Sequence, residues 1–128
     1  MILDTSALVA IVIREPGWEG LLDRVSDAPA AGVGAPTLAE AGLVLTGRIG
    51  PEGKRLLALF VMEFEIVVVT FGDAHWKVAV DAFRRFGKGR HPAGLNFGDC
   101  LSYATAKLAG QPLLCTGKDF ARTDLELG

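Results

Sequence analysis

The chain has 128 residues, of which 50% are hydrophobic and 22% are charged, a balance that excludes a disordered or fibrous protein. Its formal net charge of −2 provides no general attraction to nucleic acid, and its longest apolar run, residues 7–13, is far shorter than the roughly twenty residues of a membrane span. We therefore expect one cytoplasmic globular domain over residues 1–128 that does not enter a membrane and contacts any nucleic acid through a local basic patch.

The first half of the chain alternates short apolar runs with amphipathic segments. An initial strand ends at Asp4, and Thr5 or Ser6 is expected to cap the helix that follows. Pro-Gly at 16–17 and Gly-Pro at 50–51 separate later elements. The pattern predicts a strand over 2–4, helices over 7–10 and 18–27, a strand over 31–34, a helix over 36–45 and another helix ending near residue 62.

The second half begins with the strongest strand signal of the chain. Residues 66–69 are β-branched and continuous, which is typical of a strand buried on both faces. An amphipathic helix is predicted over 73–86, with Trp76, Val80 and Phe83 on its apolar face. The remaining pattern predicts a loop over 87–94, a helix from its cap Asn96 to Leu108 with Gly110 as its stop, a strand over 112–115 and an edge strand over 124–127.

Strands and helices thus alternate along the whole chain, without a linker or an internal repeat. This alternation predicts an α/β fold with a mostly parallel central β-sheet flanked by α-helices. Crossover connections between parallel strands are right-handed, and the carboxyl ends of such strands meet along one crevice. Side chains that follow the strands are therefore the first candidates for a functional site.

Four acids stand in apolar surroundings or after strands, namely Asp4, Glu40, Asp99 and Asp119. Each has a purely structural alternative. Asp4 can cap its own helix, and Asp119 can begin a helical turn. Glu40 completes Thr37-x-x-Glu and Asp99 completes Asn96-x-x-Asp, which are the spacings of helix capping boxes. The sequence alone leaves these alternatives open.

Acids that meet at one crevice repel one another and require a compensating cation. Oxygen ligands without histidine or cysteine select a hard ion, Mg²⁺ or Mn²⁺, and such ions commonly act on phosphate groups. We expect Asp4 and Asp99 to bind the metal, and Glu40 and Asp119 to complete the catalytic set.

Two hydroxyl residues stand beside these acids. Ser6, two residues after Asp4, is expected to orient that carboxylate by a hydrogen bond, and Thr116 is expected to do the same from the other side. Their structural alternatives are a helix cap for Ser6 and a turn residue for Thr116.

A basic segment precedes Asn96. Residues 84–91 contain several cations and no acid, and the glycines at 87 and 89 make part of this segment a loop. A solvated charged surface is one interpretation of it. The functional interpretation is an arm that grips the phosphate backbone of single-stranded or looped RNA. The residues expected to bind RNA are Arg84, Arg85, Lys88 and Arg90.

The two cysteines, Cys100 and Cys115, lie among apolar neighbours and form no Cys-x-x-Cys pair. Their spacing does not favour a zinc site or a disulfide scaffold. We expect both to be buried, reduced thiols.

Four separated segments carry the acids and their neighbours in order. They are Ile-Leu-Asp-Thr-Ser-Ala-Leu-Val-Ala at 2–10, Leu-Ala-Glu-Ala-Gly-Leu-Val-Leu at 38–45, the segment 87–103 with its core Asn-Phe-Gly-Asp-Cys, and Gly-Gln-Pro-Leu-Leu at 110–114. Together these segments resemble the PIN-domain ribonucleases, and in particular the VapC-type toxins of toxin–antitoxin pairs. The resemblance extends from residue 2 to about residue 124, and Asn-Phe-Gly-Asp-Cys is its most specific part.

The resemblance implies a single PIN-like domain and Mg²⁺- or Mn²⁺-dependent endonucleolytic cleavage of RNA. By position, it implies that Asp4, Glu40 and Asp99 are the first three acids of the family's site and that Asp119 is the more variable fourth. Ser6 matches a small hydroxyl residue near the metal. The resemblance also implies a homodimer and a VapB-type antitoxin that occupies and blocks the active-site groove.

One departure from the family's pattern concerns the fourth acid. The turn before this acid often carries a lysine ahead of its glycine, whereas here it reads Thr116-Gly117-Lys118-Asp119. A cation directly beside Asp119 can draw that carboxylate away from a metal ion.

The sequence therefore predicts a metal-dependent endoribonuclease that acts as the toxin of a VapBC-type pair. One alternative is a non-catalytic interaction subunit whose acids bind a basic partner. Another is a Mg²⁺-dependent phosphatase or phosphoacceptor domain, which needs a second acid beside Asp4 or two positions after it. Thr5 and Ser6 occupy those positions and disfavour this last alternative.

Overall fold

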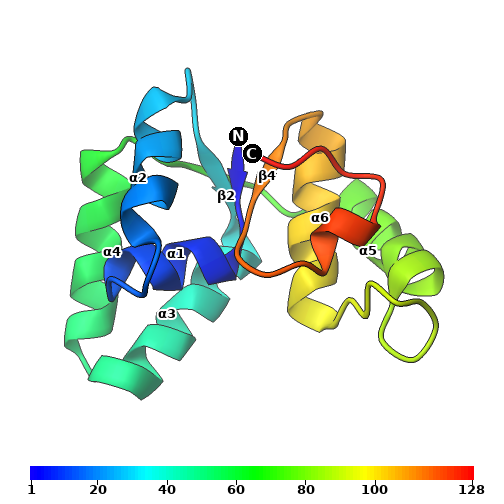
Figure 1. Ribbon diagram of the computed structural model, residues 1–128, viewed down its shortest axis with the longest axis horizontal. Coiled ribbons are helices and arrows are strands. Elements are labelled where there is room, and N and C mark those ends of the chain that lie inside the picture. Colours follow the sequence, from blue (N-terminus) through cyan, green and yellow to red (C-terminus); the bar gives the residue numbers. More distant parts are fainter.

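The computed structural model describes residues 1–128 as helices packed around a small parallel sheet (Figure 1). The strands are β1 (Ile2–Leu3), β2 (Gly32–Gly34), β3 (Val67–Val69) and β4 (Leu113–Leu114). The helices are α1 (Thr5–Val12), α2 (Trp18–Asp27), α3 (Ala35–Ile49), α4 (Glu52–Glu63), α5 (Asp73–Phe86), α6 (Phe97–Ala109) and the short 3₁₀-helix η1 (Phe120–Arg122). The predicted α/β class is confirmed.

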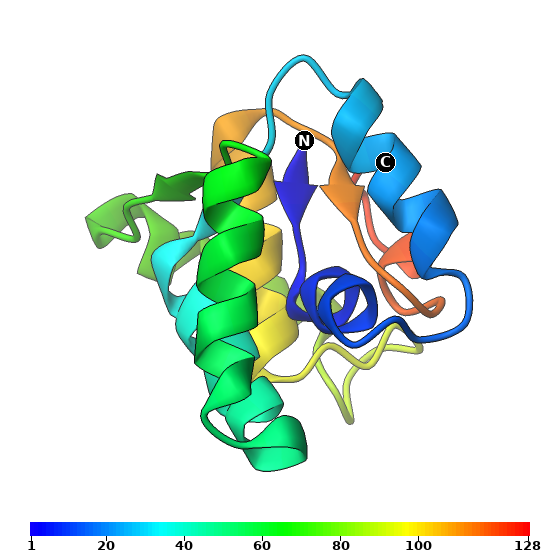
Figure 2. The ribbon, with the colours of Figure 1, turned by 90° about the vertical axis from the view of Figure 1, so that its left-hand side faces the viewer.

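The sheet has the strand order β3-β2-β1-β4, and every pair in it is parallel. Helices α1 to α4 lie on one side of the sheet and helices α5 and α6 on the other (Figures 1 and 2). The two termini lie close together at one end of the sheet (Figure 1). Since all the strands run in the same direction, their carboxyl ends meet at the opposite end of the sheet.

Two hydrophobic cores hold the layers together, one on each side of the sheet. Alternation along the strands divides the side chains between them: Leu3 and Leu114 point into the core with α1 to α4, whereas Ile2 and Leu113 point into the core with α5 and α6. Because a strand buried on both faces needs apolar residues at every position, β1 and β4 are uniformly apolar. None of the helices combines the length and the apolar character needed to cross a membrane.

The first helix begins earlier than predicted. Its N-terminal cap is Asp4, whose carboxylate accepts the backbone N–H of Ser6, so the prediction of Thr5 or Ser6 as the cap is wrong. Helix α3 also exceeds its predicted range, because it continues to Ile49 and ends at Gly50. The Asn96 cap and the Gly110 stop of α6 are confirmed.

The strongest predicted strand is not buried on both faces. β3 lies at the edge of the sheet, and Val67 and Val68 are 58% and 47% exposed. The β-branched run does form a strand, but both Val67 and Val68, which point to opposite faces, remain largely exposed. At the other edge, the predicted strand over 124–127 is reduced to a single parallel bridge between Leu127 and Leu113.

Helix α5 does not bury the face that its sequence pattern indicates. The residues that pack into the core are Ala79, Ala82 and Phe86. Trp76 and Val80 are 52% and 58% exposed, and Phe83 is also exposed. These three side chains and the exposed Phe97 form what we call the α5 apolar face, which borders a groove of about 380 Å³.

Candidate active site

Asp4 lies at the end of β1 and is the most buried acid of the chain, with 4% of its surface exposed. Its Oδ2 accepts hydrogen bonds from the N–H and the hydroxyl of Ser6, at 3.1 and 2.6 Å. Its Oδ1 accepts a hydrogen bond from the hydroxyl of Ser102 on α6, at 2.6 Å. All of these donors are uncharged, so they orient the carboxylate without neutralising it.

Glu40 projects from α3 toward the start of α1, where its carboxylate accepts a hydrogen bond from the hydroxyl of Thr5. The capping-box interpretation of Thr37 and Glu40 is wrong, because α3 is capped by Gly34 and Thr37 lies buried inside the helix. Helix α6 approaches the carboxylate closely at Gly98, where a Cβ atom would overlap the oxygens of Glu40.

Asp99 stands in the first turn of α6 and takes part in a capping box. Its N–H donates to the side chain of Asn96 at 2.9 Å, and its carboxylate accepts the N–H of Asn96 at 3.1 Å. Burial is the main cause that raises the pKa of Asp99 to about 6, and the nearby charges of Asp4, Asp119 and Glu40 contribute to the same rise. The capping role and the proximity to the other acids therefore exist together.

These three acids lie around one cleft of about 300 Å³ at the carboxyl end of the sheet. Asp4 comes from the end of β1, Glu40 from α3 and Asp99 from α6, and all three line the cleft. Asp119 does not line it. Asp119 is exposed in the turn before η1, although its charge contributes to the raised pKa of Asp99.

Ser6 lines the cleft and connects the residues that follow strands β1 and β4. Its hydroxyl donates to Asp4 and accepts the backbone N–H of Thr116 at 3.0 Å. Thr116 lines the cleft, but the contact that it makes with this network comes from its backbone rather than from the hydroxyl that we expected. The segment after β4 is thereby held against the start of α1.

Four residues of this site were missing from the sequence interpretation. Ser102 and Thr5 donate hydrogen bonds to the carboxylates of Asp4 and Glu40, and Glu15 and Arg48 also line the cleft. Ser102 had a usable signal, because it stands three residues after Asp99 and therefore on the same face of a helix. Arg48 had none, since the predicted helix ended at residue 45.

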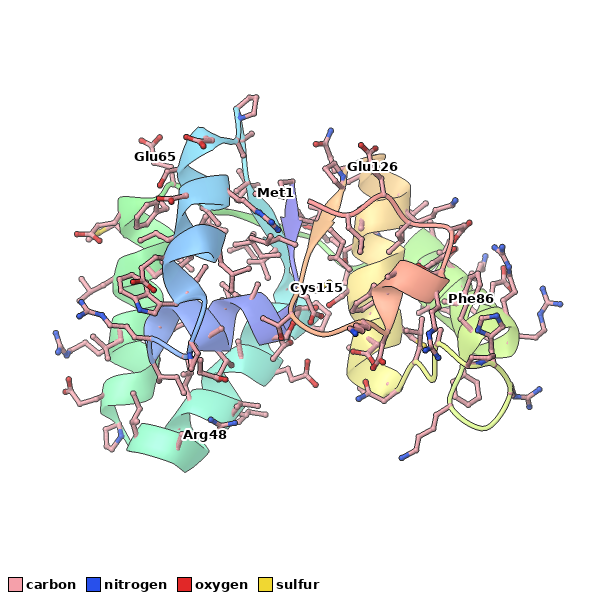
Figure 3. The ribbon with its side chains drawn as sticks, in the orientation of Figure 1. Met1, Arg48, Glu65, Phe86, Cys115 and Glu126 are labelled. Carbon is pink, nitrogen blue, oxygen red and sulfur yellow. The ribbon has the colours of Figure 1, made fainter.

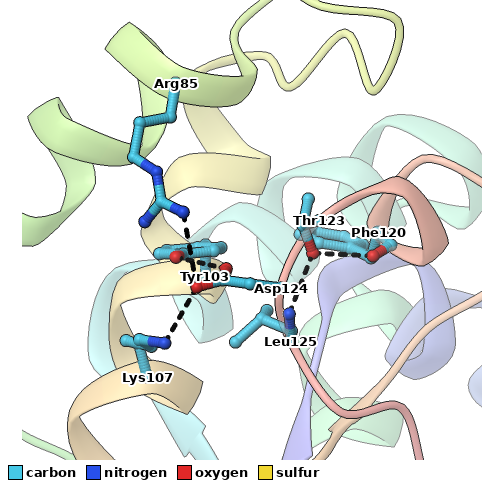
Figure 4. Close-up of polar contacts among 7 residues, drawn as sticks. All are labelled: Arg85, Tyr103, Lys107, Phe120, Thr123, Asp124 and Leu125. Atoms are coloured by element: carbon cyan, nitrogen blue, oxygen red, sulfur yellow. Dashed lines mark hydrogen bonds and ion pairs between the residues drawn. The ribbon is translucent and has the colours of Figure 1, made fainter.

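None of the four basic residues expected to bind RNA lines the cleft. Arg85 pairs with Asp124 at 3.6 Å, and Asp124 also accepts hydrogen bonds from Tyr103 and Lys107 (Figure 4). Lys88 and Arg90 belong to the loop that leads from α5 to Asn96 at the start of α6 (Figure 1). Arg84 lies 3.8 Å from Asp81 on the exposed side of α5.

Both cysteines are free thiols, and only Cys100 is fully buried, whereas Cys115 is partly exposed. Burial, together with a smaller contribution from neighbouring acids, raises the pKa of each thiol to about 11. Neither cysteine is therefore a thiolate nucleophile at neutral pH.

The chemistry of the cleft fits a hard divalent cation. Carboxylates line the cleft, and no histidine or cysteine does. No ion pair of the structure involves Asp4, Glu40 or Asp99. The carboxylates line the cleft without closing into a coordination shell, because no three His, Cys, Asp or Glu side chains are grouped closely enough to hold an ion. Oxygen donors whose charge is uncompensated are the set that Mg²⁺ and Mn²⁺ prefer.

Comparisons with known proteins agree with this architecture. The sequence matches the PIN domain family over residues 1–126. It is 44% identical over 125 residues to a protein of Mycolicibacterium smegmatis named Ribonuclease VapC, covering 98% of this chain and 97% of that protein. It is 46% identical over 127 residues to Ribonuclease VapC36 of Mycobacterium tuberculosis, covering 98% of this chain and 91% of that protein.

Two solved structures share the fold at low sequence identity. The first is VapC20 of Mycobacterium tuberculosis, described as a toxin that cleaves the sarcin-ricin loop, with a TM-score of 0.79, 17% identity and coverage of 97% of this chain and 95% of that one. The second is VapBC2 of Rickettsia felis bound to a DNA fragment from its promoter, with a TM-score of 0.74, 14% identity and coverage of 99% and 96%.

Proposed function

The chain belongs to the PIN-domain family, in which its curated relatives are VapC ribonucleases, and we propose that it is the metal-dependent endoribonuclease toxin of a VapBC-type pair. The observation that carries this proposal is the cleft formed by Asp4, Glu40 and Asp99, whose carboxylates come from three elements and have no cationic partner.

Asp4 and Asp99 are the proposed ligands of Mg²⁺ or Mn²⁺, with Glu40 beside them. When bound, the ion supplies Lewis-acid chemistry, because it polarises a phosphate and favours the ionised form of water. The chain's own contribution is orientation. Hydroxyl groups hold Asp4 from both sides, and the Thr5 hydroxyl holds Glu40. These uncharged donors leave the negative charge of the site available to a cation.

RNA is the proposed substrate, and the loop of Lys88 and Arg90 supports this assignment. The loop ends at Asn96, which itself lines the acidic cleft. A strand whose phosphates contact this loop is therefore led toward the carboxylates, and such contacts suit single-stranded or looped RNA. No serine, cysteine or histidine nucleophile is required for hydrolysis of the phosphodiester bond.

The test is cleavage of total cellular RNA by purified protein with Mg²⁺ and with EDTA. We expect cleavage with Mg²⁺ only, and its loss in Asp4→Asn. The matched control is Asp23→Asn, which changes an exposed acid of α2 in the same way and is expected to cut normally. Cleavage in EDTA, or full activity of Asp4→Asn, would contradict the proposal. Hydrolysis of phosphomonoesters would favour a phosphatase, and inactivity of the wild type would favour an interaction subunit.

A VapB-type antitoxin and a second copy of the chain are the proposed partners. Two apolar surfaces support two separate contacts: the α5 apolar face and a groove of about 660 Å³ between α3 and α4. The groove lies along two helices, and such a surface suits an amphipathic helix of an antitoxin, whose continuation would block the cleft. We assign the α5 apolar face to the homodimer. Size-exclusion chromatography with light scattering, without and with the antitoxin, tests both contacts.

A further inference from the structure

A single basic side chain lines the acidic cleft, and it is Arg48. Arg48 lies in the last turn of α3, the helix that also carries Glu40, and Figure 3 labels it there. Glu40, Val44 and Arg48 follow one another at intervals of four residues, so they share one face of the helix, and all three line the cleft. The rise of an α-helix separates Glu40 from Arg48 by about 12 Å along the axis.

The acid that pairs with Arg48 is Glu15, which also lines the cleft. The two side chains are 3.8 Å apart at their closest charged atoms, and they are 56% and 42% exposed. A long, exposed ion pair of this kind is weak. By contrast, Arg55 on α4 holds Glu52 at 2.6 Å. The guanidinium of Arg48 can therefore exchange Glu15 for another anion at little cost.

We propose that Arg48 binds a phosphate of the RNA strand on one side of the bond that is cut, and that Glu15 competes with that phosphate for the guanidinium. This inference rests on the proposed function. A guanidinium recognises phosphate by two parallel hydrogen bonds, which fix orientation as well as position. Because Arg48 stands about two helical turns from Glu40, it holds a flanking phosphate and sets the position of the strand in the cleft.

The proposal predicts opposite changes in KM when Arg48 or Glu15 is replaced. Arg48→Gln removes the cation and is expected to raise KM about tenfold with kcat within twofold of the wild type, because the contact exists before and during the reaction. Glu15→Gln removes the competing anion and is expected to lower KM severalfold. Arg48→Lys keeps the charge and is expected to fall between the wild type and Arg48→Gln. The control Arg55→Gln removes a cation outside the cleft and is expected to change neither constant.

Two measurements test the proposal. The first is the kinetics of cleavage, with Mg²⁺, of an oligoribonucleotide that carries a site cut by the wild type. The second is made in EDTA, where the proposed mechanism permits no cleavage, and measures the Kd of a fluorescein-labelled copy of that oligonucleotide by anisotropy at several KCl concentrations. Loss of one phosphate contact is expected to reduce the slope of log Kd against log[KCl] by about one in Arg48→Gln. A merely structural role would leave this slope unchanged.

The results separate this inference from the proposed function. If the wild type does not cut RNA with Mg²⁺, the proposed function is wrong. If the wild type cuts RNA but Arg48→Gln has the same KM and the same salt slope, the role of Arg48 is overturned while the function stands. A fall in kcat alone, or a higher KM in Glu15→Gln, would also overturn it.

Discussion

The hydroxyl of Ser102 lies 2.6 Å from Oδ1 of Asp4 and joins two residues that are 98 positions apart in the chain. Both side chains are buried. This hydrogen bond connects the end of β1 to α6, the helix that carries Asp99, and so sets the position of one acid relative to the other. The geometry of the cleft therefore depends on a residue that has no charge.

Ser102→Ala is expected to weaken both the fold and the site, because it leaves one oxygen of a buried carboxylate without a donor. The expected loss of stability is about 1–3 kcal/mol, measured by urea unfolding without metal. Affinity for Mg²⁺ is expected to fall about tenfold, as titration calorimetry would measure. Ser26→Ala, an exposed change on α2, is the control. Unchanged stability and unchanged affinity in Ser102→Ala would mean that this hydrogen bond has no part in shaping the site.

Gly98→Ala is expected to reduce RNA cleavage at least tenfold, since the added Cβ overlaps the carboxylate of Glu40 and pushes it out of the cleft. The control is Gly47→Ala in α3, where a Cβ meets nothing within 4 Å. Because alanine loses less backbone entropy than glycine when a helix forms, this variant is expected to be more stable by about 0.5–1 kcal/mol. Cleavage assays and thermal unfolding measure both effects, and equal activity of the two variants would refute the packing argument.

Much of the site could be predicted from the sequence because its acids follow strands or begin helices. Asp4 ends β1, and Asp99 stands three residues after the cap of α6, so the topology of a parallel sheet brings them to the same end of the molecule. The spacing of Ser102 from Asp99 indicated only a shared helix face, and the contact of Ser102 with Asp4 and the contact of Arg48 with Glu15 could not be predicted. The roles of Ser102 and Arg48 depend on which side chain faces them across the fold, and neither forms part of a local pattern with its partner.

The two errors about burial have one physical cause. An apolar run such as Val67 to Val69, or the apolar stripe of α5 that contains Val80, has the same pattern whether its own chain or another chain covers it. In this structure β3 is an edge strand and Val80 is exposed. An apolar pattern in a strand or helix therefore predicts an apolar surface, but it does not show whether that surface packs against the same chain or against another chain.

Val80→Asp is expected to convert a dimer to a monomer, because it places a charge at the centre of the α5 apolar face. Light scattering after size-exclusion chromatography measures the change. Ala74→Asp is the control, since it adds the same charge to an exposed position of the same helix that lies about 120° around the axis from Val80 and opposite Phe83. The fold is expected to survive in both variants. A dimer that persists in Val80→Asp would show that the two copies meet elsewhere.

Asp99→Asn is expected to stabilise the metal-free protein at pH 7.5 but not at pH 4. The pKa of Asp99 is about 6 in the folded protein and 3.8 in its ordinary state, with burial as the main cause. As the pH rises through this interval, the unfolded chain loses a proton that the folded protein still retains, so the free energy of unfolding decreases. Asparagine still accepts the hydrogen bond from Asn96, and because it does not titrate it removes this pH-dependent decrease in the free energy of unfolding.

The Tm values of the wild type and the variant, measured in EDTA from pH 4 to 8, should therefore diverge progressively, with the variant the more stable. Mg²⁺ should raise Tm of the wild type more than that of the variant at pH 7.5. Parallel Tm curves in EDTA would show that the charge of Asp99 carries no such cost.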